Sequence, residues 1–195
     1  MAQVYSIEGT DLNAEPEEGR VPGIHIEGWM QPVELFWLEN IASYMGSIVE
    51  VGTWKGRSAY CLASACPNVE TIDDFSGEPH RYSAAIADKS VHDEFVKNCA
   101  VFLENGRLKS TVGDSVSLAE DHEIVDMVFL DGAHEYESVK ADILAWGPRA
   151  RVVLAGHDYD MEGVRKAVDE VFGKSVKRGY GQIWYIEMSQ NIGEF

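Results

Sequence analysis

The chain has 195 residues, of which 33 are acidic and 16 are basic, so its formal net charge at pH 7 is −17. An acidic surface repels phosphate backbones and anionic lipid headgroups, and this argues against nucleic acid and membranes as partners. Hydrophobic residues make up 45% of the chain, which is typical of a folded globular domain and not of a disordered one.

The cysteines and the N-terminal residues predict a cytoplasmic protein. Cys61, Cys66 and Cys99 are odd in number and form no Cys-x-x-Cys pair, which favours reduced, buried thiols over disulfides or a zinc site. Residues 1–20 lack the basic and then apolar pattern of a secretion signal. No apolar run reaches the roughly 18 residues that a membrane span needs.

Apolar spacing predicts one doubly wound α/β domain, with residues 1–30 as an irregular lead-in or lid and residues 31–188 as the core. Helical periodicity indicates helices near 32–45, 56–65, 88–104, 116–121, 136–146 and 164–172. Short β-branched runs indicate strands at 47–52, 69–73, 108–112, 126–131 and 151–155. Residues 174–188 indicate two more strands around a turn at 179–181. Alternating strands and helices predict a parallel sheet with helices on both faces, and the tail predicts an antiparallel edge.

The predicted carboxyl ends of the strands carry a row of acids. In open α/β sheets the ligand binds beyond these ends. Each of the first five strands ends at or beside an acidic residue: Glu50, Asp73 with Asp74, Asp114, Asp131 and Asp158. Because neighbouring carboxylates repel each other, such a row indicates an edge that holds hydroxyl groups, a cationic group or a metal.

The first predicted strand leads into a glycine loop with the spacing Glu50-x-Gly52-x-x-x-Gly56. This spacing differs from those of dinucleotide-binding and phosphate-binding loops, and the charge of Glu50 also disfavours a phosphate. Asp73 follows Gly52 by 21 residues. An acid at about this distance usually holds ribose hydroxyls, although a tight turn and a capping aspartate would give the same pattern.

Three segments resemble the class I S-adenosylmethionine-dependent methyltransferases. Residues 48–58 are similar to the first motif of that family. Residues 129–142 and 153–168 resemble a subgroup that includes macrocin O-methyltransferase-like and cephalosporin-hydroxylase-like proteins. The resemblance spans about residues 29–188. It implies a Rossmann-like seven-stranded sheet with an antiparallel last strand, and methyl transfer to a small-molecule or sugar acceptor, most often at oxygen.

The resemblance also implies which residues bind S-adenosyl-L-methionine. The positions expected around its methionine end are Glu50, Gly52, Thr53, Ser58 and Asp131. Asp73 and Asp74 are expected at the ribose, and Asp114 and Ser115 at the adenine.

Several members of the subgroup use a divalent metal, usually Mg²⁺, and the matching positions here are Asp131, His157 and Asp158. Mg²⁺ prefers oxygen ligands, so His157 would suit Mn²⁺ better. The alternative is that Asp158 caps the next helix and His157 is a hydrogen-bonded core residue.

The catalytic candidates are His134, His157 and Asp131. Ala133 stands where some related sugar enzymes carry an acidic base, so the base role falls to His134 or His157. His134 would otherwise only fix its loop.

Two segments are predicted as lids over the site: the lead-in with His25, Trp29 and Met30, and the loop 76–82. Lys140 and Asp142 are expected on a solvated helix face. The alternatives are a hydroxylase-like or nicotinamide-dependent enzyme on the same fold and a non-catalytic binding protein. A homo-oligomer that completes the site is a further expectation.

Overall fold

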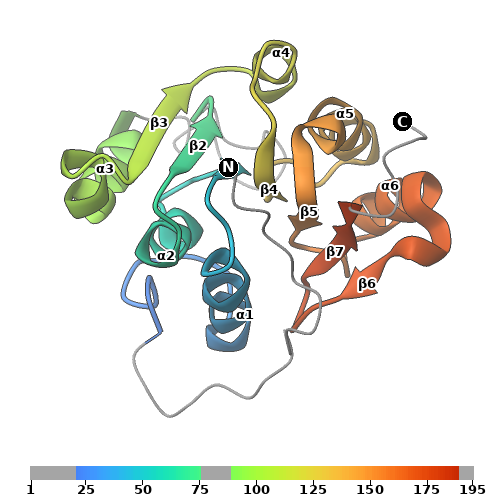
Figure 1. Cartoon of the computed structure of the whole chain (residues 1–195), viewed down its shortest axis with the longest axis horizontal. Helices are drawn as coiled ribbons and strands as arrows, with labels where there is room; N and C mark the ends of the chain where they lie inside the picture. Colours follow the sequence, from blue (N-terminus) through green and yellow to red (C-terminus); the bar gives the residue numbers. More distant parts are fainter. Residues whose placement is uncertain (1–20, 76–88, 189–195) are drawn as a thin grey trace, which may run out of the picture.

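The computed structural model describes residues 21–75 and 89–188. Their seven strands form one sheet in the order β3-β2-β1-β4-β5-β7-β6 (Figure 1). The strands are β1 (Ile48–Val51), β2 (Val69–Asp73), β3 (Leu108–Val112), β4 (Val125–Leu130), β5 (Ala150–Gly156), β6 (Lys177–Arg178) and β7 (Trp184–Glu187). The first five run parallel to one another, and β7 is antiparallel to both of its neighbours. The predicted doubly wound sheet with a reversed last strand is therefore confirmed.

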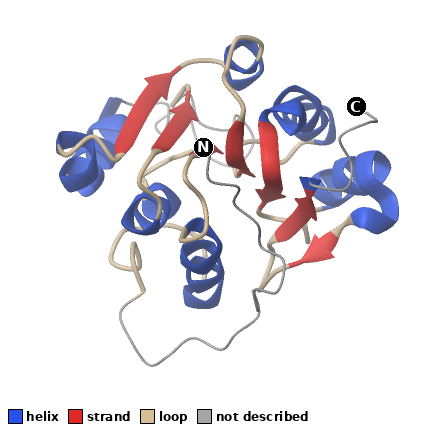
Figure 2. Cartoon of the chain, viewed as in Figure 1, coloured by secondary structure: helices blue, strands red, loops and turns tan. Residues whose placement is uncertain are grey.

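Helices cover both faces of this sheet (Figure 2). The α-helices are α1 (Pro32–Ala42), α2 (Arg57–Ala65), α3 (Lys89–Glu104), α4 (Ser115–Ala119), α5 (Tyr136–Trp146) and α6 (Glu162–Phe172). Two short 3₁₀ turns, η1 (Gly147–Arg149) and η2 (Gly173–Ser175), follow α5 and α6. None of the described helices is long and apolar enough to cross a membrane.

Successive side chains of each strand point to opposite faces of the sheet, and this divides the core into two layers. On β1, Ile48 packs into the layer under α1, α2 and α3, while Val49 packs into the layer under α5 and α6. On β4, Met127 and Val128 alternate in the same way. A central strand buried on both faces reads as a continuous apolar run, which is why these strands are visible in the sequence.

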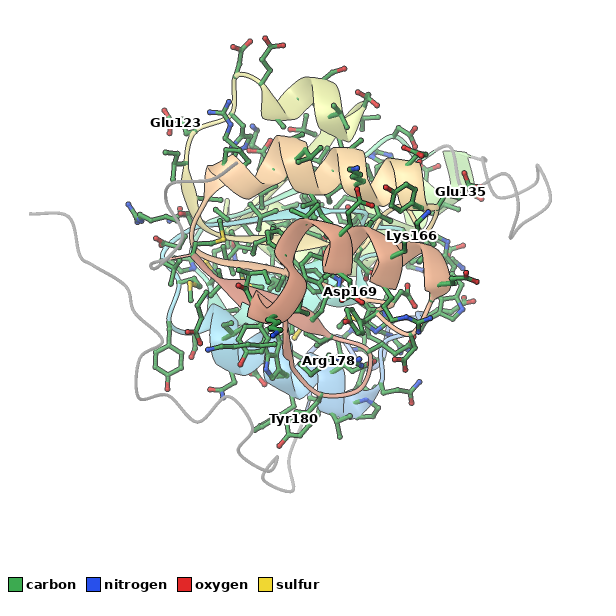
Figure 3. All side chains as sticks on the ribbon, turned by 90° about the vertical axis from the view of Figure 1, so that its right-hand side faces the viewer. Glu123, Glu135, Lys166, Asp169, Arg178 and Tyr180 are labelled. Carbon is green, nitrogen blue, oxygen red and sulfur yellow. The ribbon has the colours of Figure 1, made fainter. Side chains whose placement is uncertain are left out.

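Helices α5 and α6 lie next to each other on one face of the molecule (Figure 3). Each starts just after a loop at the carboxyl edge of the sheet. Gly163, in the first turn of α6, allows this packing, because a Cβ there would lie 2.3 Å from the carbonyl oxygen of His134. The close contact fixes the loop after β4 against the start of α6.

The observed ends of the elements differ from the predicted ones by at most three residues, and β2, β3 and α5 have the predicted ends. The first helix ends at Ala42 and not near 45, since Ser43 begins a turn in which its hydroxyl donates to the Asn40 carbonyl. The fourth strand runs from Val125 to Leu130, one residue earlier than predicted. Asp131 therefore lies just beyond the strand, at the edge where ligands bind.

Candidate functional site

A cleft of about 800 Å³ opens at the carboxyl edge of the parallel strands. Its walls include the loops that follow the five parallel strands, β1 to β5, and the segment before α1. Most of the predicted site residues line it: Gly52, Thr53, Ser58, Asp73, Asp74, Asp114, Ser115, Asp131, His134, His157 and Asp158. Glu50 is not among the lining residues that the structure describes. The topology thus gathers residues that lie more than 100 positions apart in the chain.

Gly52 occupies a position that no other residue fits. Its φ is +90°, in the region that favours glycine. A Cβ would stand 2.4 Å from the carbonyl oxygen of Asp131 and 2.5 Å from the Cα of Gly132. The loops after β1 and β4 touch backbone to backbone here, which leaves the cleft floor without a side chain.

Asp73, at the end of β2, holds the glycine loop in place. Its Oδ2 accepts the backbone N–H groups of Thr53 (2.7 Å) and Trp54 (2.9 Å), and its Oδ1 accepts that of Phe75 (2.7 Å). A carboxylate offers about four acceptor positions, so these bonds leave capacity for a ligand hydroxyl. The spacing between Gly52 and Asp73 therefore has a structural cause in addition to its proposed role at a ribose.

Glu50 lies beneath this loop, fully buried, and not in the cleft. The Thr71 hydroxyl donates to its Oε2 at 2.6 Å, and the Ser58 hydroxyl also bonds to its carboxyl group. Burial raises the pKa of Glu50 to about 8, despite these hydrogen bonds. Glu50 is thus a neutral carboxylic acid at pH 7 that supports the loop from below. This position differs from the expected one around the methionine end of the cofactor, since Glu50 does not line the cleft.

The loop after β3 forms the far end of the cleft. The Asp114 side chain accepts the Ser117 N–H at 2.9 Å and so caps α4. The Ser115 hydroxyl donates to Asp142 at 2.5 Å. Asp142 is buried, which corrects the prediction of a solvated side chain, and burial raises its pKa. The helix period placed Asp142 on a polar face, but α4 covers that face.

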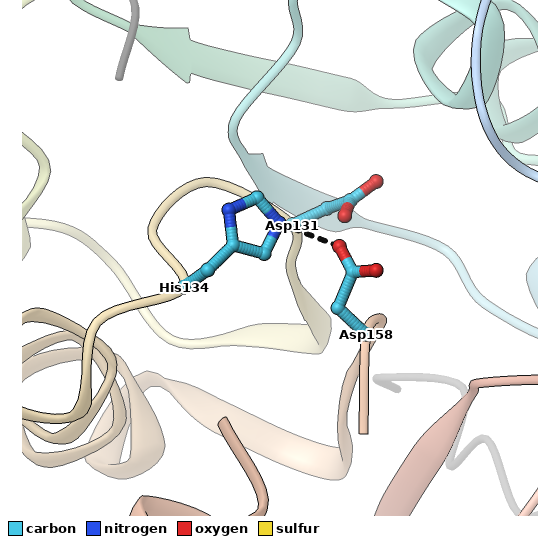
Figure 4. Close-up of side chains that lie close together, drawn as sticks. All are labelled: Asp131, His134 and Asp158. Carbon is cyan, nitrogen blue, oxygen red and sulfur yellow. Dashed lines mark hydrogen bonds and ion pairs between the residues drawn. The ribbon is translucent and has the colours of Figure 1, made fainter. Parts of the chain in front are cut away.

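Asp131, His134 and Asp158 converge at the ends of β4 and β5 (Figure 4). Each offers one ligand atom, and these atoms lie within 4.8 Å of one another. His134 Nε2 and Asp158 Oδ2 are 2.5 Å apart. The group of three that the geometry favours for a metal therefore contains His134 in place of the predicted His157. The helix-capping alternative for Asp158 is wrong, because the N-cap of α6 is Met161.

His157 is instead a buried cation between acids. Its Nε2 lies 3.2 Å from Glu34, and its Nδ1 lies 3.4 Å from Asp158 and 3.6 Å from Asp131. Burial would lower the pKa of His157, but the charge of Asp131 and the contacts with Asp158 and Glu34 raise it to about 11. A group that keeps its proton at neutral pH is a poor general base, so the geometry favours His134 for that role.

The two acids beside His157 respond differently to the same surroundings. Burial raises the pKa of Asp131 to about 7, against the opposing charge of His157. Burial acts in the same direction on Asp158, but hydrogen bonds with His134 and His157 hold its pKa well below the usual range. Asp158 also has a φ of +57°, a strained conformation for aspartate that is frequent at functional sites. Asp158 is therefore the permanently charged member of the cluster.

The segment before α1 forms one wall of the cleft, and its action as a lid stays a prediction. Trp29 and Met30 line the cleft, and His25 packs against Tyr60 on the outside. Arg57 fixes the segment, because its Nε and Nη1 donate to the carbonyl oxygens of Ile26 (2.6 Å) and Met30 (2.8 Å). The second predicted lid, residues 76–82, lies outside the described residues.

Two residues of the site were missed by the sequence analysis. Glu34 is buried and accepts the N–H groups of Gln31 (2.6 Å) and Gln182 (2.7 Å) in addition to its contact with His157. Burial would raise the pKa of Glu34, but these contacts lower it. The signal was present, since Gln31 and Glu34 form a capping box at the start of α1. The second missed residue is Thr71, which bonds to Glu50, and no signal in the sequence of its strand identifies it.

The fold and the cleft define a class I methyltransferase architecture, in which a mostly parallel seven-stranded sheet ends in a reversed strand. The sequence pattern of a family described as a methyltransferase domain matches residues 49–159. The chain belongs to this family. The matched residues run from β1 to just beyond β5 and contain all of the cleft loops from Gly52 to Asp158.

The chain is also similar to one protein in sequence and to solved O-methyltransferases in structure. The protein y4gI of Sinorhizobium fredii is 29% identical over 123 residues, a match that covers 58% of this chain and 13% of y4gI. An O-methyltransferase from Bacillus cereus, crystallised in complex with SAH, is 17% identical, with 82% of each chain covered and a TM-score of 0.60. The O-methyltransferase TomG from Streptomyces achromogenes, in complex with SAM, is 16% identical, and the match covers 82% of this chain and 81% of TomG with a TM-score of 0.55. At these identities the two structures establish the shared fold.

Proposed function

We propose that this protein transfers a methyl group from S-adenosyl-L-methionine to an oxygen atom of a small-molecule or sugar acceptor. One observation carries the proposal: Asp73 locks a glycine loop at the floor of an acid-lined cleft, on a chain that belongs to a methyltransferase-domain family. Family membership supports the reaction type, and the cleft residues support the assignment of roles below.

The cleft fits the cofactor in size and in charge. Its volume of about 800 Å³ lies within the usual range for small-molecule sites. The missing side chain at Gly52 allows close approach to the backbone, and acids at the strand ends suit a ligand with a positively charged sulfur and an ammonium group. When bound, the cofactor supplies an activated methyl group, so the protein mainly has to align the acceptor and exclude water.

His134 is the residue that we assign to proton removal from the acceptor hydroxyl. Asp158 accepts from its Nε2, which fixes the tautomer in which Nδ1 is the basic nitrogen. His157 keeps Asp158 and Asp131 in place from the buried side. Deprotonated Asp131 faces the cleft and stabilises positive charge close to the reacting atoms.

A divalent metal bound by Asp131, His134 and Asp158 is a second arrangement, supported by the close approach of their three ligand atoms. Two carboxylates and an imidazole suit Mn²⁺ better than Mg²⁺. The metal would lower the pKa of an acceptor hydroxyl and orient it. His134 would then be a ligand, and its contact with Asp158 would have to open.

The experiment that tests the proposed function is a calorimetric titration of the full chain with S-adenosylmethionine, S-adenosylhomocysteine and NADH. Saturable one-to-one binding of the first two, without binding of NADH, is the expected result. Binding of NADH alone would overturn the proposal in favour of a nicotinamide-dependent enzyme.

A further inference from the structure

We propose that the acceptor is an uncharged or cationic molecule with an apolar ring face, and that this face stacks on Trp29 at the mouth of the cleft. The inference rests on the proposed methyl transfer and narrows its acceptor. Two independent features of the cleft carry it: an exposed aromatic ring held in a fixed position, and the sign of the charge on the walls.

Trp29 stands out among the exposed apolar residues. Trp29 is 52% exposed, and of the exposed large hydrophobic residues that the structure describes, only Trp29 and Val116 line the cleft. Val116 belongs to α4, at the end assigned to the adenine. Trp29 belongs to the segment before α1 and packs against the glycine loop. An exposed indole costs free energy in water, and a ring-bearing ligand recovers it by stacking.

The indole of Trp29 is held in place although it is exposed. It packs against Trp54 with ring centroids 4.2 Å apart. Arg57 bonds to the carbonyl oxygens of Ile26 and Met30 on either side, and Lys55 pairs with Glu27 at 2.8 Å. A binding surface that is already ordered loses little conformational entropy when the ligand arrives.

Trp54 connects this surface to the loop assigned to the cofactor. It lies in the glycine loop, and its backbone N–H donates to Asp73. Its φ of +46° is unusual for tryptophan and marks a conformation imposed by the surroundings. A ring stacked on Trp29 therefore lies beside the loop assigned to the cofactor, on the side that is open to solvent.

The charges on the walls decide against an anionic acceptor. Seven carboxylate side chains line the cleft, and Arg57 is the one lysine or arginine among the described lining residues. Arg57 already donates to two carbonyl oxygens, and His134 and His157 are already paired with acids. A carboxylate or phosphate on the acceptor would meet a net negative potential, at a cost of about tenfold in affinity for each charge at a separation of roughly 12 Å and an effective dielectric constant of about 20.

An aromatic ring with adjacent hydroxyls and a sugar with an apolar face both fit this description. Two probe sets separate them, each holding the ring constant while the charge changes. The aromatic set is 3,4-dihydroxybenzyl alcohol, 3,4-dihydroxybenzylamine and 3,4-dihydroxybenzoate. The sugar set is methyl β-D-glucopyranoside, its 2-amino-2-deoxy analogue and its uronate.

The test is ligand-observed NMR on the full chain saturated with S-adenosylhomocysteine, with the wild type and the Trp29→Ala and Tyr44→Ala variants. Tyr44 is also an exposed aromatic residue but lies outside the cleft lining, so it is the matched control. We expect the neutral and cationic members of at least one set to bind, and the anionic member to bind at least about tenfold more weakly. Trp29→Ala should weaken the neutral probe by about tenfold, with an unchanged affinity for S-adenosylhomocysteine, and Tyr44→Ala should change neither.

Four results would overturn the inference. Two concern the probes: equal binding of the anionic members, and no binding of any of the six. Two concern Trp29→Ala: unchanged affinity for the neutral probe, and a loss of S-adenosylhomocysteine affinity, which would assign the indole to the cofactor. Failure of the wild type to bind S-adenosylhomocysteine would instead overturn the proposed function itself, so the two failures are distinguishable.

Discussion

Replacing Gly52 with alanine tests the backbone contact that forms the floor of the cleft. The alanine would have to keep a φ near +90°, which costs roughly 1–2 kcal/mol for a residue with a side chain. Its Cβ would also stand 2.4 Å from the Asp131 carbonyl oxygen, so the loops after β1 and β4 would have to separate. Overpacking of this kind costs roughly 1–3 kcal/mol, so the free energy of unfolding should fall by about 2–5 kcal/mol in total.

Gly106→Ala is the matched control. Gly106 has a φ of +77°, but a Cβ there would have no neighbour within 4 Å among the described residues. This variant therefore carries the conformational cost without the contact. Urea unfolding should show Gly52→Ala to be less stable than Gly106→Ala by about 1–3 kcal/mol. Calorimetry should show S-adenosylhomocysteine binding weakened at least about tenfold in Gly52→Ala and unchanged in Gly106→Ala.

Equal unfolding free energies for the two variants would refute the reasoning, since the contact with Asp131 would then carry no cost. Normal cofactor binding by Gly52→Ala would refute the proposed position of the cofactor above the loop. Either result can be read because Gly106 lies in the turn between α3 and β3 and is not part of the cleft lining.

Three further variants follow from the buried charges. Because burial in the folded state raises the pKa of Glu50 to about 8, its ionisation opposes folding, and the free energy of unfolding should fall as the pH rises from about 4.5 to 8. Glu50→Gln should flatten this pH dependence, which urea unfolding midpoints measured at pH 5 to 9 would show. An unchanged pH dependence would contradict the assignment. Glu34→Gln should lower the free energy of unfolding by about 3 kcal/mol, because it removes a buried partner of His157; a change below 1 kcal/mol in urea unfolding would show that the pair is unimportant. If Asp131, His134 and Asp158 bind Mn²⁺, electron paramagnetic resonance should show binding to the wild type that His134→Ala weakens by at least about tenfold, and equal binding would place any metal elsewhere.

The fold was predictable because its elements carry local signals. The strands around Val49 and Val128 are buried on both faces and mostly apolar, and the helices are bounded by residues such as Pro32 and Gly147. The glycine loop and the acid after β2 were also visible, because they are set by short-range spacing. The ends of the elements were less certain, since hydrogen bonds such as that of Ser43 decide the last turn.

The site was only partly predictable, because its decisive contacts join distant parts of the chain. Glu34 and His157 are 123 positions apart, so no spacing rule pairs them. Strand-end position alone could not separate His134 from His157 as the candidate base. The separation came from burial, because the His157 side chain is 3% exposed among three acids, whereas that of His134 is 19% exposed and lines the cleft. Asp142 was misjudged for the same reason, since helix periodicity does not show what covers a polar face.

The measurement that tests the central claim most directly is calorimetric titration of S-adenosylhomocysteine into the wild type, Asp73→Ala and, as a control, Asp121→Ala, which removes an exposed acid outside the cleft lining. We predict one-to-one binding to the wild type and to Asp121→Ala, and a loss of at least about tenfold in Asp73→Ala, because the glycine loop would lose its anchor and the ribose its acceptor. Equal affinity in all three proteins, or no binding to the wild type, would contradict the account.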